Sequence, residues 1–337
     1  FFSPLRTMAM WLGEPYGPPD AEQLADPYES QVGGLAKLPE WAAGDFNPKR
    51  VSCGVCGYPM YLLLQAYCPY DDLERIFLVY ACNTGACMAQ PTKSWQAWRL
   101  QRPVPEERKD EKTDEEEQEE EEEEEDAAKG GEMVVKGTAC GPASADDDED
   151  ESPGALPVGL PPSTPFTLPC FALDLFEEPA KEVPMVDLAA EMRKMEEINA
   201  NTDPGIKVDD LEDVHREIPQ FQEDHVFNSF QNRLQRCPRQ VVRWGINGKP
   251  LFISEEGRPS TPRLPPCDVC GCNRVMELQL MPTLVFFCKP YEHLHEGVLK
   301  GDEGLDFGTV TVYSCAAMCR GATVSPEYIH VQPPPKE

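Results

Sequence analysis

The sequence has few basic residues and no long apolar stretch. Its 337 residues include 30 Lys plus Arg against 60 Asp plus Glu, which gives a formal net charge of −30. Because nucleic-acid binding depends on cationic side chains that displace counterions from phosphates, this balance argues against direct binding to nucleic acid. No apolar run approaches the ~18 to 20 residues of a membrane helix. We therefore expect a soluble chain that binds neither nucleic acid nor a membrane.

Motifs of the common enzyme classes are also missing. The sequence has no Gly-rich phosphate loop after an expected strand, no Gly-x-Ser-x-Gly elbow and no His-Glu-x-x-His. We therefore expect no enzymatic activity and no small-molecule substrate. The first residues, Phe1-Phe2-Ser3-Pro4, lack the basic region, apolar core and small-residue cleavage site of a secretory signal. This favours a reducing compartment, where thiols hold metal ions more often than they form disulfides.

Acidic residues are concentrated in one part of the chain. From Glu106 to Glu151 there are 23 acidic and five basic residues, so this stretch carries −18 of the −30, and Asp114 to Asp126 is acidic except at Gln118. Such a block repels itself and cannot bury apolar surface, so we expect it to stay disordered. The composition predicts an N-terminal module at 1–104, a disordered acidic and Pro-rich linker at 105–185, a helical connection at 186–236 and a C-terminal module at 237–337.

The two modules have the pattern of short strands, and the connection has that of helices. Apolar residues three or four positions apart predict amphipathic helices at 186–199 and 223–236. Short runs bounded by Gly, Pro, Asn or Asp predict strands at 60–66, 75–81, 275–281 and 309–313. The predicted fold class is therefore mainly β with some α.

An internal repeat relates the two modules. Each contains a Cys-x-Val-Cys-Gly segment, with a Leu-Gln pair that begins eight residues after its second Cys. Each continues with Val-Tyr-(Ala or Ser)-Cys, one more Cys four or five residues later, and an apolar-Gln pair near a Pro. The corresponding segments are 53–57 and 267–271, Leu64-Gln65 and Leu278-Gln279, 79–82 and 312–315, and Leu100-Gln101 and Val331-Gln332. A duplicated module explains this order better than chance does.

The repeated cysteines have the spacing of tetrahedral zinc sites. Zn²⁺ takes four soft ligands, and two short Cys pairs on tight turns supply two thiolates each when a hairpin brings the turns together. The Gly after each Cys-x-x-Cys permits the backbone angles that such a turn often requires. We predict two structural zinc ions, one at Cys53, Cys56, Cys82 and Cys87, and one at Cys267, Cys270, Cys315 and Cys319. A site with four Cys ligands leaves zinc no open position to activate water.

Other interpretations of these residues stay open. A Cys-x-x-Cys can be a redox pair, although that pair usually begins a helix in a βαβ unit, and disulfides are a further alternative. Cys272 lies two residues after Cys270 and could replace a neighbouring ligand. His293-x-His295 has the composition of a metal pair, but this spacing on a polar loop is more typical of plain surface. The remaining thiols have no partner at ligand spacing and fit packing or linker positions: Cys68, Cys140, Cys170, Cys237 and Cys288.

At these residues the sequence resembles the programmed cell death protein 2 family, which includes a yeast rRNA-accumulation factor and an animal 2-like paralogue. The resemblance covers nearly all of both modules and omits the linker. The matching stretches are Trp11 to Gly13, Ser30 to Gly34, Pro39 to Trp41, Cys53 to Cys87, Asp224 to Phe230, Pro238 to Trp244, Pro250-Leu251, and Cys267 to Cys319. The sequence departs from the family in its long acidic insertion and in lacking the additional zinc finger that some animal members carry between the halves. No partner of that finger is carried over to this chain.

The resemblance implies a dedicated chaperone. Family members look like proteins that capture one newly made small-subunit ribosomal protein, called S-two in eukaryotes and uS-five in the universal naming, and deliver it to 40S ribosome assembly. A free ribosomal protein is strongly basic, so an acidic binder can shield its charges and suppress wrong nucleic-acid contacts. We expect the β modules to grip this client, and we expect a monomer that works in the cytoplasm and can shuttle to the nucleus.

Two features have a structural interpretation beside the functional one. The block from Asp114 to Asp126 either attracts the client or serves only as a solvated spacer that maintains solubility. Trp95, Trp98 and Trp244 either belong to a gripping surface or pack within and between the modules, and Trp at the margin of a β module more often packs.

The alternative function is a zinc-dependent scaffold for protein–protein interaction in nuclear regulation or cell-death control, and a thiol oxidoreductase is a third class. For the architecture we predict two related zinc-bearing β modules, packed face to face about an approximate two-fold axis. Short modules with one apolar sheet face need a partner to cover it. Helices from 186–236 are expected to bridge the modules.

Overall fold

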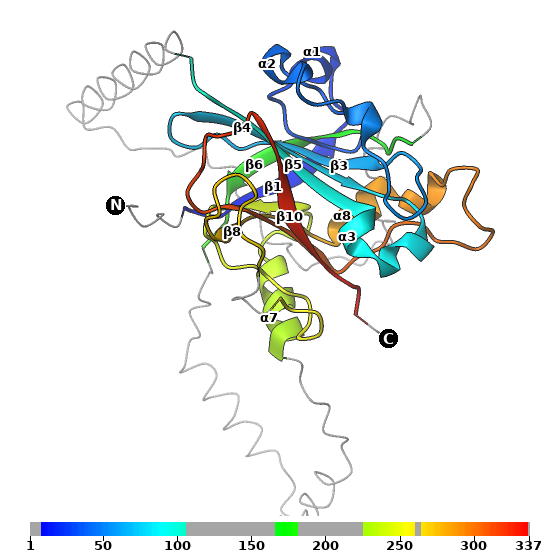
Figure 1. Ribbon diagram of the computed structural model, residues 1–337. Helices are drawn as coiled ribbons and strands as arrows, with labels where there is room; N and C mark the ends of the chain where they lie inside the picture. The colour runs from blue at the N-terminus through cyan, green and yellow to red at the C-terminus, as the bar shows by residue number, and fades with distance from the viewer. Residues whose placement is uncertain (1–7, 106–165, 181–224, 260–263, 336–337) are drawn as a thin grey trace, which may run out of the picture.

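The computed structural model describes residues 8–105, 166–180, 225–259 and 264–335. Within these ranges, antiparallel strands form one closed barrel in the order β1-β6-β2-β3-β4-β5-β10-β9-β8-β7 (Figure 1). The fold is mainly β with some helix, as the sequence predicts. None of the helices in these described ranges is both long enough and apolar enough to cross a membrane.

The strands are separated by short helices and turns. The strands are β1 (Trp11–Gly17), β2 (Gln31–Val32), β3 (Tyr61–Tyr67), β4 (Leu73–Ala81), β5 (Trp95–Pro103), β6 (Phe171–Glu177), β7 (Val242–Trp244), β8 (Arg274–Leu280), β9 (Thr309–Cys315) and β10 (Val324–Gln332). The helices are α1 (Ala21–Ala25), α2 (Glu40–Ala43), α3 (Pro91–Ser94), α7 (His225–Leu234) and α8 (Thr283–Cys288), with 3-10 turns η1 (Pro48–Arg50), η2 (Gly85–Ala89) and η4 (Pro290–Glu292).

Several predicted elements are present, and others were missed. The four predicted strands are β3, β4, β8 and β9, and the helix predicted at 223–236 is α7. The helix predicted at 186–199 and the acidic block at 114–126 lie outside the described residues. Sequence analysis did not anticipate β1, β2, β6 or β7. Of these, β6 lies inside the segment 105–185 that was predicted to be linker throughout, and here the prediction is wrong for residues 171–177.

The internal repeat extends from the sequence to the strand pairing. In the first half, residues 8–105, Gln31 of β2 pairs with Gln65 of β3. In the second half, residues 166–335, Arg243 of β7 pairs with Gln279 of β8 in the same way. The register of the hairpin that follows shifts at the same place in both halves, at the residue before the Leu of the Leu-Gln pair. The halves are therefore related β modules, with β1 to β5 corresponding to β6 to β10.

The first strands of the two halves are exchanged. β1 pairs with β6 and β7 of the second half, and β6 pairs with β1 and β2 of the first half. On the other side of the barrel, β5 pairs with β10. The modules therefore do not pack face to face as two separate sheets, which corrects the expected arrangement. Joining them edge to edge leaves neither sheet with an open edge, because every strand has two neighbours.

The glutamine of each repeated Leu-Gln pair holds a loop against the barrel. The Gln65 side chain accepts the N–H of Lys37 at 2.8 Å and donates to the carbonyl of the same residue at 3.1 Å. In the same manner, the Gln279 side chain accepts the N–H of Leu251 at 3.0 Å and donates to the carbonyl of Leu251 at 2.8 Å. Each amide thus satisfies both polar groups of one residue in a loop beside the barrel. The motif was found as a repeat marker, and its role is to fix this loop.

The central strands are buried on both faces. On β4, Phe77 and Val79 belong to the largest apolar cluster, which draws residues from both halves and fills the barrel. Ile76 and Leu78 belong to a second cluster on the outside of the first half, together with residues of α2 and of the segment 46–60. Successive strand residues point to opposite faces, so continuous burial of β4 requires a layer on each side.

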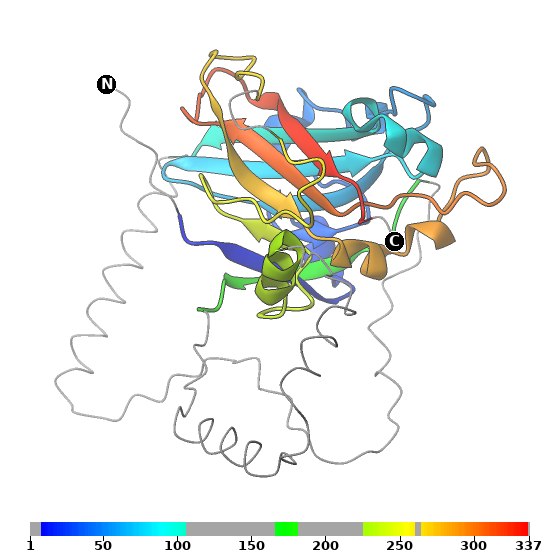
Figure 2. The ribbon, with the colours of Figure 1, turned by 90° about the horizontal axis from the view of Figure 1, so that it is seen from below.

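The outside of the second half is covered by α7 (Figure 2). Phe230 is the buried residue of this helix, and it packs with Ile253 and Met281. Phe227 and Leu234 add partly buried contacts at helical spacing. The apolar stripe of the helix therefore packs against the barrel.

Gly33 lets the end of β2 approach the segment before β6. Its φ is +68°, and a Cβ at this position would lie 1.9 Å from the carbonyl oxygen of Pro169. No residue with a side chain fits there, because both the backbone angle and the space require glycine. The contact helps to explain the Ser30 to Gly34 stretch that the sequence analysis singled out.

Candidate metal centres

The first group of four cysteines lies where one hairpin brings two turns together. Cys53 and Cys56 precede β3, Cys82 directly follows β4, and Cys87 lies in η2. Tyr61 at the start of β3 pairs with Ala81 at the end of β4, so the two turns meet at one end of the hairpin. The four sulfur atoms lie within 4.8 Å of one another.

The second group repeats this arrangement around β8 and β9. Cys267 and Cys270 precede β8, Cys315 ends β9, and Cys319 lies in the turn that follows. Their sulfur atoms also lie within 4.8 Å of one another. Because β4, β5, β10 and β9 are successive antiparallel neighbours, the ends of β4 and β9 point in opposite directions. The two groups therefore lie at opposite ends of the barrel.

Each Cys-x-x-Cys segment forms the same turn. Gly57 has φ +77° and donates its N–H to the carbonyl of Cys53 at 2.9 Å. Gly271 has φ +72° and donates to Cys267 at 2.8 Å. At both positions a left-handed residue closes the turn, which explains the glycine after each pair. The turns hold the two sulfurs of each pair on the same side.

The spacing of the sulfur atoms fits a tetrahedral metal ion. A Zn–S bond of ~2.3 Å implies sulfur atoms about 3.8 Å apart in a regular tetrahedron. The distance from Cys56 Sγ to Cys82 Sγ is 3.6 Å, that from Cys267 to Cys319 is 3.6 Å, and that from Cys270 to Cys315 is 3.3 Å. No disulfide joins any of the cysteines that the structure describes. The two groups could thus hold metal ions, and four thiolates are compatible with zinc.

The thiols of each group differ in their affinity for protons. Burial opposes ionisation of Cys267, but N–H groups of Cys270 and Val269 more than offset it, and the pKa falls to about 7. The pKa of Cys53 is lowered in the same way, against burial, by the N–H groups of Cys56 and Val55. Burial raises the pKa of Cys87 to about 12, and it also raises the pKa values of Cys82, Cys315 and Cys319. A metal ion would have to displace these protons, so metal binding would weaken as the pH falls.

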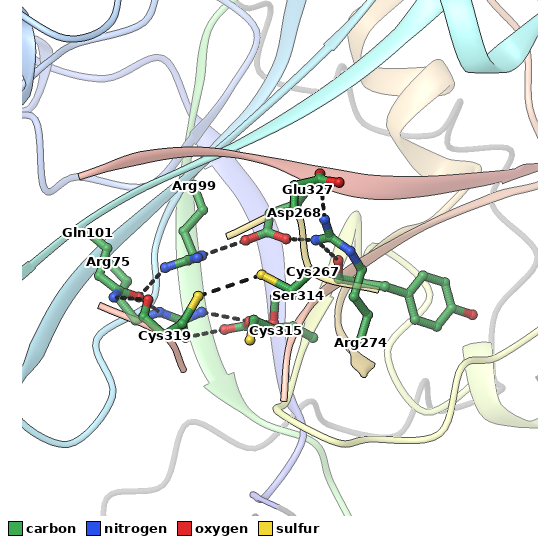
Figure 3. Close-up of polar contacts among 12 residues, drawn as sticks. Arg75, Arg99, Gln101, Cys267, Asp268, Arg274, Ser314, Cys315, Cys319 and Glu327 are labelled. Atoms are coloured by element: carbon green, nitrogen blue, oxygen red, sulfur yellow. Dashed lines mark hydrogen bonds and ion pairs between the residues drawn. The ribbon is translucent and has the colours of Figure 1, made fainter. Parts of the chain in front are cut away.

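Buried ion pairs lie beside the second group (Figure 3). Arg75 of β4 and Glu277 of β8 form a fully buried pair, although three strands separate them around the barrel. The pair therefore crosses the interior. Glu277 also accepts a hydrogen bond from Ser314, the neighbour of Cys315. Removing either partner would leave a buried charge without compensation, which costs about 3 to 5 kcal/mol.

A second part of this network joins the halves at the β5–β10 junction. Arg99 and Arg274 both pair with Glu327 (Figure 3). Burial opposes the charge on Arg99, but Glu327, and more weakly Glu277 and Cys319, raise its pKa. Four thiolates and one divalent ion would together carry two negative charges, so a guanidinium at this place would stabilise such a site.

A loop of the second half contacts the turn that contains Cys82 and Cys87 of the first group. Asn83, next to Cys82, donates to the carbonyls of Pro290 at 2.8 Å and His293 at 3.1 Å, and accepts the N–H of Leu305 at 2.9 Å. Two residues later, the N–H of Gly85 donates to Asp302 at 2.8 Å. Residues 289–306, which we call the covering loop, are therefore attached to the second Cys turn of the other half. Sequence reasoning missed this contact.

The other candidate ligands lie outside the two groups. The Cys272 carbonyl accepts the N–H of Cys267, and its sulfur is not a member of the second group. Cys68, Cys170, Cys237 and Cys288 are buried thiols, which fits their expected packing role, and Cys140 lies outside the described residues. His295 contacts Thr84 and the ring of Tyr58, and the His293 carbonyl accepts from Asn83. Neither histidine is part of a metal-binding group within the described ranges.

The three tryptophans pack against apolar clusters. Trp95 is 2% exposed and contacts Phe307 edge to face inside the barrel. Trp98 packs against the second cluster beside Phe46, and Trp244 packs against the largest cluster. All three side chains therefore take part in packing. Trp98 and Trp244 are only partly buried, whereas Trp95 is buried and cannot contact a protein partner.

The sequence matches known proteins along most of its length. Family models for the N-terminal and the C-terminal domain of programmed cell death protein 2 match residues 13–117 and 224–333. The human protein named Programmed cell death protein 2-like is 28% identical over 347 residues, covering 91% of each chain. The bovine Programmed cell death protein 2 is 24% identical over 334 residues, covering 91% of this chain and 92% of its own.

A shorter match comes from fission yeast. The Schizosaccharomyces pombe protein named "Probable 20S rRNA accumulation protein 4" is 34% identical over 84 residues, covering 24% of this chain and 21% of its own. No solved structure matches this chain.

Proposed function

Because this chain belongs to the programmed cell death protein 2 family, we propose that it is a dedicated chaperone for a newly made small-subunit ribosomal protein, S-two or uS-five. In this proposal the chain shields the basic client and delivers it to 40S ribosome assembly. It acts in the cytoplasm, can accompany the client to the nucleus, and performs no catalysis. It works as a monomer, with the client as its protein partner.

The observation that carries the proposal is the match to a relative named for 20S rRNA accumulation, which points toward ribosome assembly. The charge of the chain supports it. A net charge of −30 is suited to a basic client and unsuited to RNA, because like charges repel and opposite charges steer association. Ribosome assembly through direct RNA contact is therefore the less favourable interpretation.

We further propose that each four-cysteine group holds a structural zinc ion. The residues for the first ion are Cys53, Cys56, Cys82 and Cys87, and those for the second are Cys267, Cys270, Cys315 and Cys319. Four sulfur ligands close the site, so the ion would supply folding free energy and leave no position for a substrate.

Native mass spectrometry of the complex purified from cells tests the function. We expect a mass that corresponds to one chain, two zinc ions and one small-subunit ribosomal protein. A preparation that contains several unrelated proteins and no ribosomal protein would contradict the chaperone proposal and favour an interaction scaffold. A chain without metal that has two reactive thiols would instead support a thiol oxidoreductase.

A charge-neutral variant tests the acidic block. Replacing Asp with Asn and Glu with Gln across 114–126 keeps the length of the segment and removes its charge. If the block attracts the client, the variant should capture less client than the wild type at low salt. The two proteins should capture equal amounts at high salt, because screening removes long-range attraction. If the block is only a spacer, capture by this variant equals that by the wild type at every salt concentration.

A further inference from the structure

One end of the barrel presents an unusual amount of exposed apolar surface. Of the ten large hydrophobic residues that are exposed in the described ranges, five belong to the covering loop, α8 or the first Cys-x-x-Cys turn. Leu299 is 78% exposed, Phe286 59% and Tyr291 56%. The other two are Val55 and Tyr58, at 39% and 40%. Large apolar side chains that gather at one place on a surface indicate an interaction site.

Contacts between the halves place Tyr58 beside the covering loop. The ring centroids of Tyr58 and His295 are 4.1 Å apart. Gly297 also lies against Tyr58, because a Cβ on this glycine would be 2.3 Å from the hydroxyl oxygen of Tyr58. Leu299 follows two residues later, and α8 precedes the loop directly. Figures 1 and 2 both show the covering loop projecting from the barrel at the end where α8 lies. We call Val55, Tyr58, Phe286, Tyr291 and Leu299, with the charges among them, the end face.

The charges on the end face are mostly acidic. Residues 286–306 contain five carboxylates and two lysines, a difference of −3. Glu296 and Glu303 are exposed. His293 and His295 do not offset this charge at neutral pH, because burial lowers the pKa of each imidazole below its usual value. A cation on the partner would therefore be attracted here.

The covering loop is held in one place. Asn83 makes three hydrogen bonds to it, and Asp302 accepts the N–H groups of both Gly85 and Gly304. An apolar surface that is already ordered loses little conformational entropy when a partner binds. The exposed side chains are thus presented by a fixed support, which is the arrangement of a preformed docking face.

We propose that the end face docks a basic protein segment that carries apolar side chains, as a lysine-rich or arginine-rich stretch with interspersed Leu or Phe would. The apolar residues provide contact area, and the carboxylates select a cationic partner. RNA and anionic membranes would be repelled by the same carboxylates. A second copy of this chain would also be repelled, since each copy has a net charge of −30. This proposal rests on the proposed function and adds the surface that meets the client.

Full-length variants test the end face. The apolar variant is Phe286→Ser, Tyr291→Ser and Leu299→Ser, and the charge variant is Glu296→Lys with Glu303→Lys. The matched control is Tyr16→Ser with Leu24→Ser, because these residues are also exposed, at 50% and 42%, and lie in β1 and α1. Thermal unfolding and metal content should equal the wild type for all three, which shows that each variant is folded.

The first probe is the purified small-subunit ribosomal protein. We expect the apolar and charge variants each to bind it at least tenfold more weakly, with the control within twofold. The loss in the charge variant should shrink as salt rises, while that in the apolar variant should persist. Unchanged binding by both variants, with the wild type binding well, would overturn the end-face proposal and leave the chaperone proposal intact.

The second probe separates the two proposals. It is a fluorescent synthetic peptide of alternating Lys-Lys-Leu triplets, compared with a Lys-Lys-Ser peptide and a single-stranded RNA of equal length. The wild type could fail to bind the ribosomal protein but bind the Lys-Lys-Leu peptide through the end face. This result would contradict the chaperone proposal and support the end-face proposal. Equal binding of both peptides, preference for RNA, or dimers in sedimentation that the apolar variant abolishes would each overturn the end-face proposal.

Discussion

At the scale of single residues, Glu178 bonds to two arginines that lie 55 and 65 residues further along the chain. Its carboxylate pairs with Arg233 of α7 and with Arg243 of β7, whose side chain is almost fully buried. Burial alone would raise the pKa of Glu178, but the two guanidinium groups more than offset this and lower it. The ion pair therefore attaches α7 to the barrel beside the apolar stripe of Phe230.

The variant Glu178→Gln should lower the free energy of unfolding by about 3 kcal/mol at pH 7, because Arg243 stays buried without a charged partner. The folded-state pKa of Glu178 lies below the unfolded value of about 4.3. Its contribution is therefore complete above the unfolded pKa and is lost as the pH falls through the folded pKa. Urea unfolding at pH 7 and near pH 3 measures the difference between the two proteins.

The difference should shrink at the lower pH, because near pH 3 the carboxyl group of the unfolded chain is already largely protonated. Glu177→Gln is the matched control, since this neighbour is exposed and its removal should change stability by less than about 0.5 kcal/mol. An equal loss at both pH values would show that the charge of Glu178 is not what stabilises the fold.

Two cysteines five residues apart test the ligand assignment. Cys267→Ser should reduce the zinc content from two ions to one and destabilise the second half, because a thiolate ligand is lost. Cys272→Ser should keep both ions, since this sulfur lies outside the second group. Elemental analysis of the two purified variants decides. Loss of metal in Cys272→Ser with full occupancy in Cys267→Ser would mean that Cys272 is the ligand.

At the scale of elements, the covering loop depends on one side chain from the other half. Asn83→Ala would leave the carbonyls of Pro290 and His293 and the N–H of Leu305 without this partner. Each unsatisfied buried group costs about 1 kcal/mol or more, so we expect a loss of about 3 kcal/mol. Hydrogen exchange of amides in 290–305 should become faster, whereas that of β10 should change little.

Asn47→Ala is the control for this variant. Asn47 is exposed and its side chain only accepts the N–H of Lys49 at the start of η1. Its loss should cost about 1 kcal/mol and leave exchange in the covering loop unchanged. If Asn83→Ala also leaves that exchange unchanged, the loop is held by contacts other than these hydrogen bonds.

The sequence predicts the elements that have a local pattern. β3, β4, β8 and β9 are apolar runs of seven or nine residues between turn signals, and they were predicted from those runs. β2 and β7 have only two and three residues, which is too short for an alternating pattern to be visible. β6 follows a Pro-rich stretch, and its composition was averaged with that of the linker.

The candidate site follows the same division. The eight cysteines were assignable because metal chemistry imposes a spacing that shows in one dimension. Arg75 and Glu277 are 202 residues apart, and Asn83 is 207 residues from Pro290, so no local pattern announces either contact. Closure of the barrel is equally non-local, since β1 pairs with strands that lie after residue 170. Only the repeat indicated that the halves belong together.

At the scale of the whole molecule, neither half contains a complete sheet. The first half has β1 to β5, but β1 pairs only with strands of the second half, and β6 pairs only with strands of the first. Fragments 1–150 and 151–337 should therefore be insoluble or unfolded when each is expressed alone. Expressed together, they should copurify as one folded complex with two zinc ions, because the cut lies outside the described barrel. Two fragments that are soluble, folded and unassociated would contradict this architecture.

The exchanged first strands also determine when the barrel can close during translation. β1 is synthesised before the other strands of the described barrel, yet both of its neighbours come from beyond residue 170. One edge of β5 stays unpaired until β10 has been made. A nascent chain that has produced only the first half therefore carries unpaired strand edges, which are prone to intermolecular pairing. Premature termination in the connecting segment would release a product with both of these edges open, so a nonsense mutation there is expected to give an aggregating fragment and no partial activity.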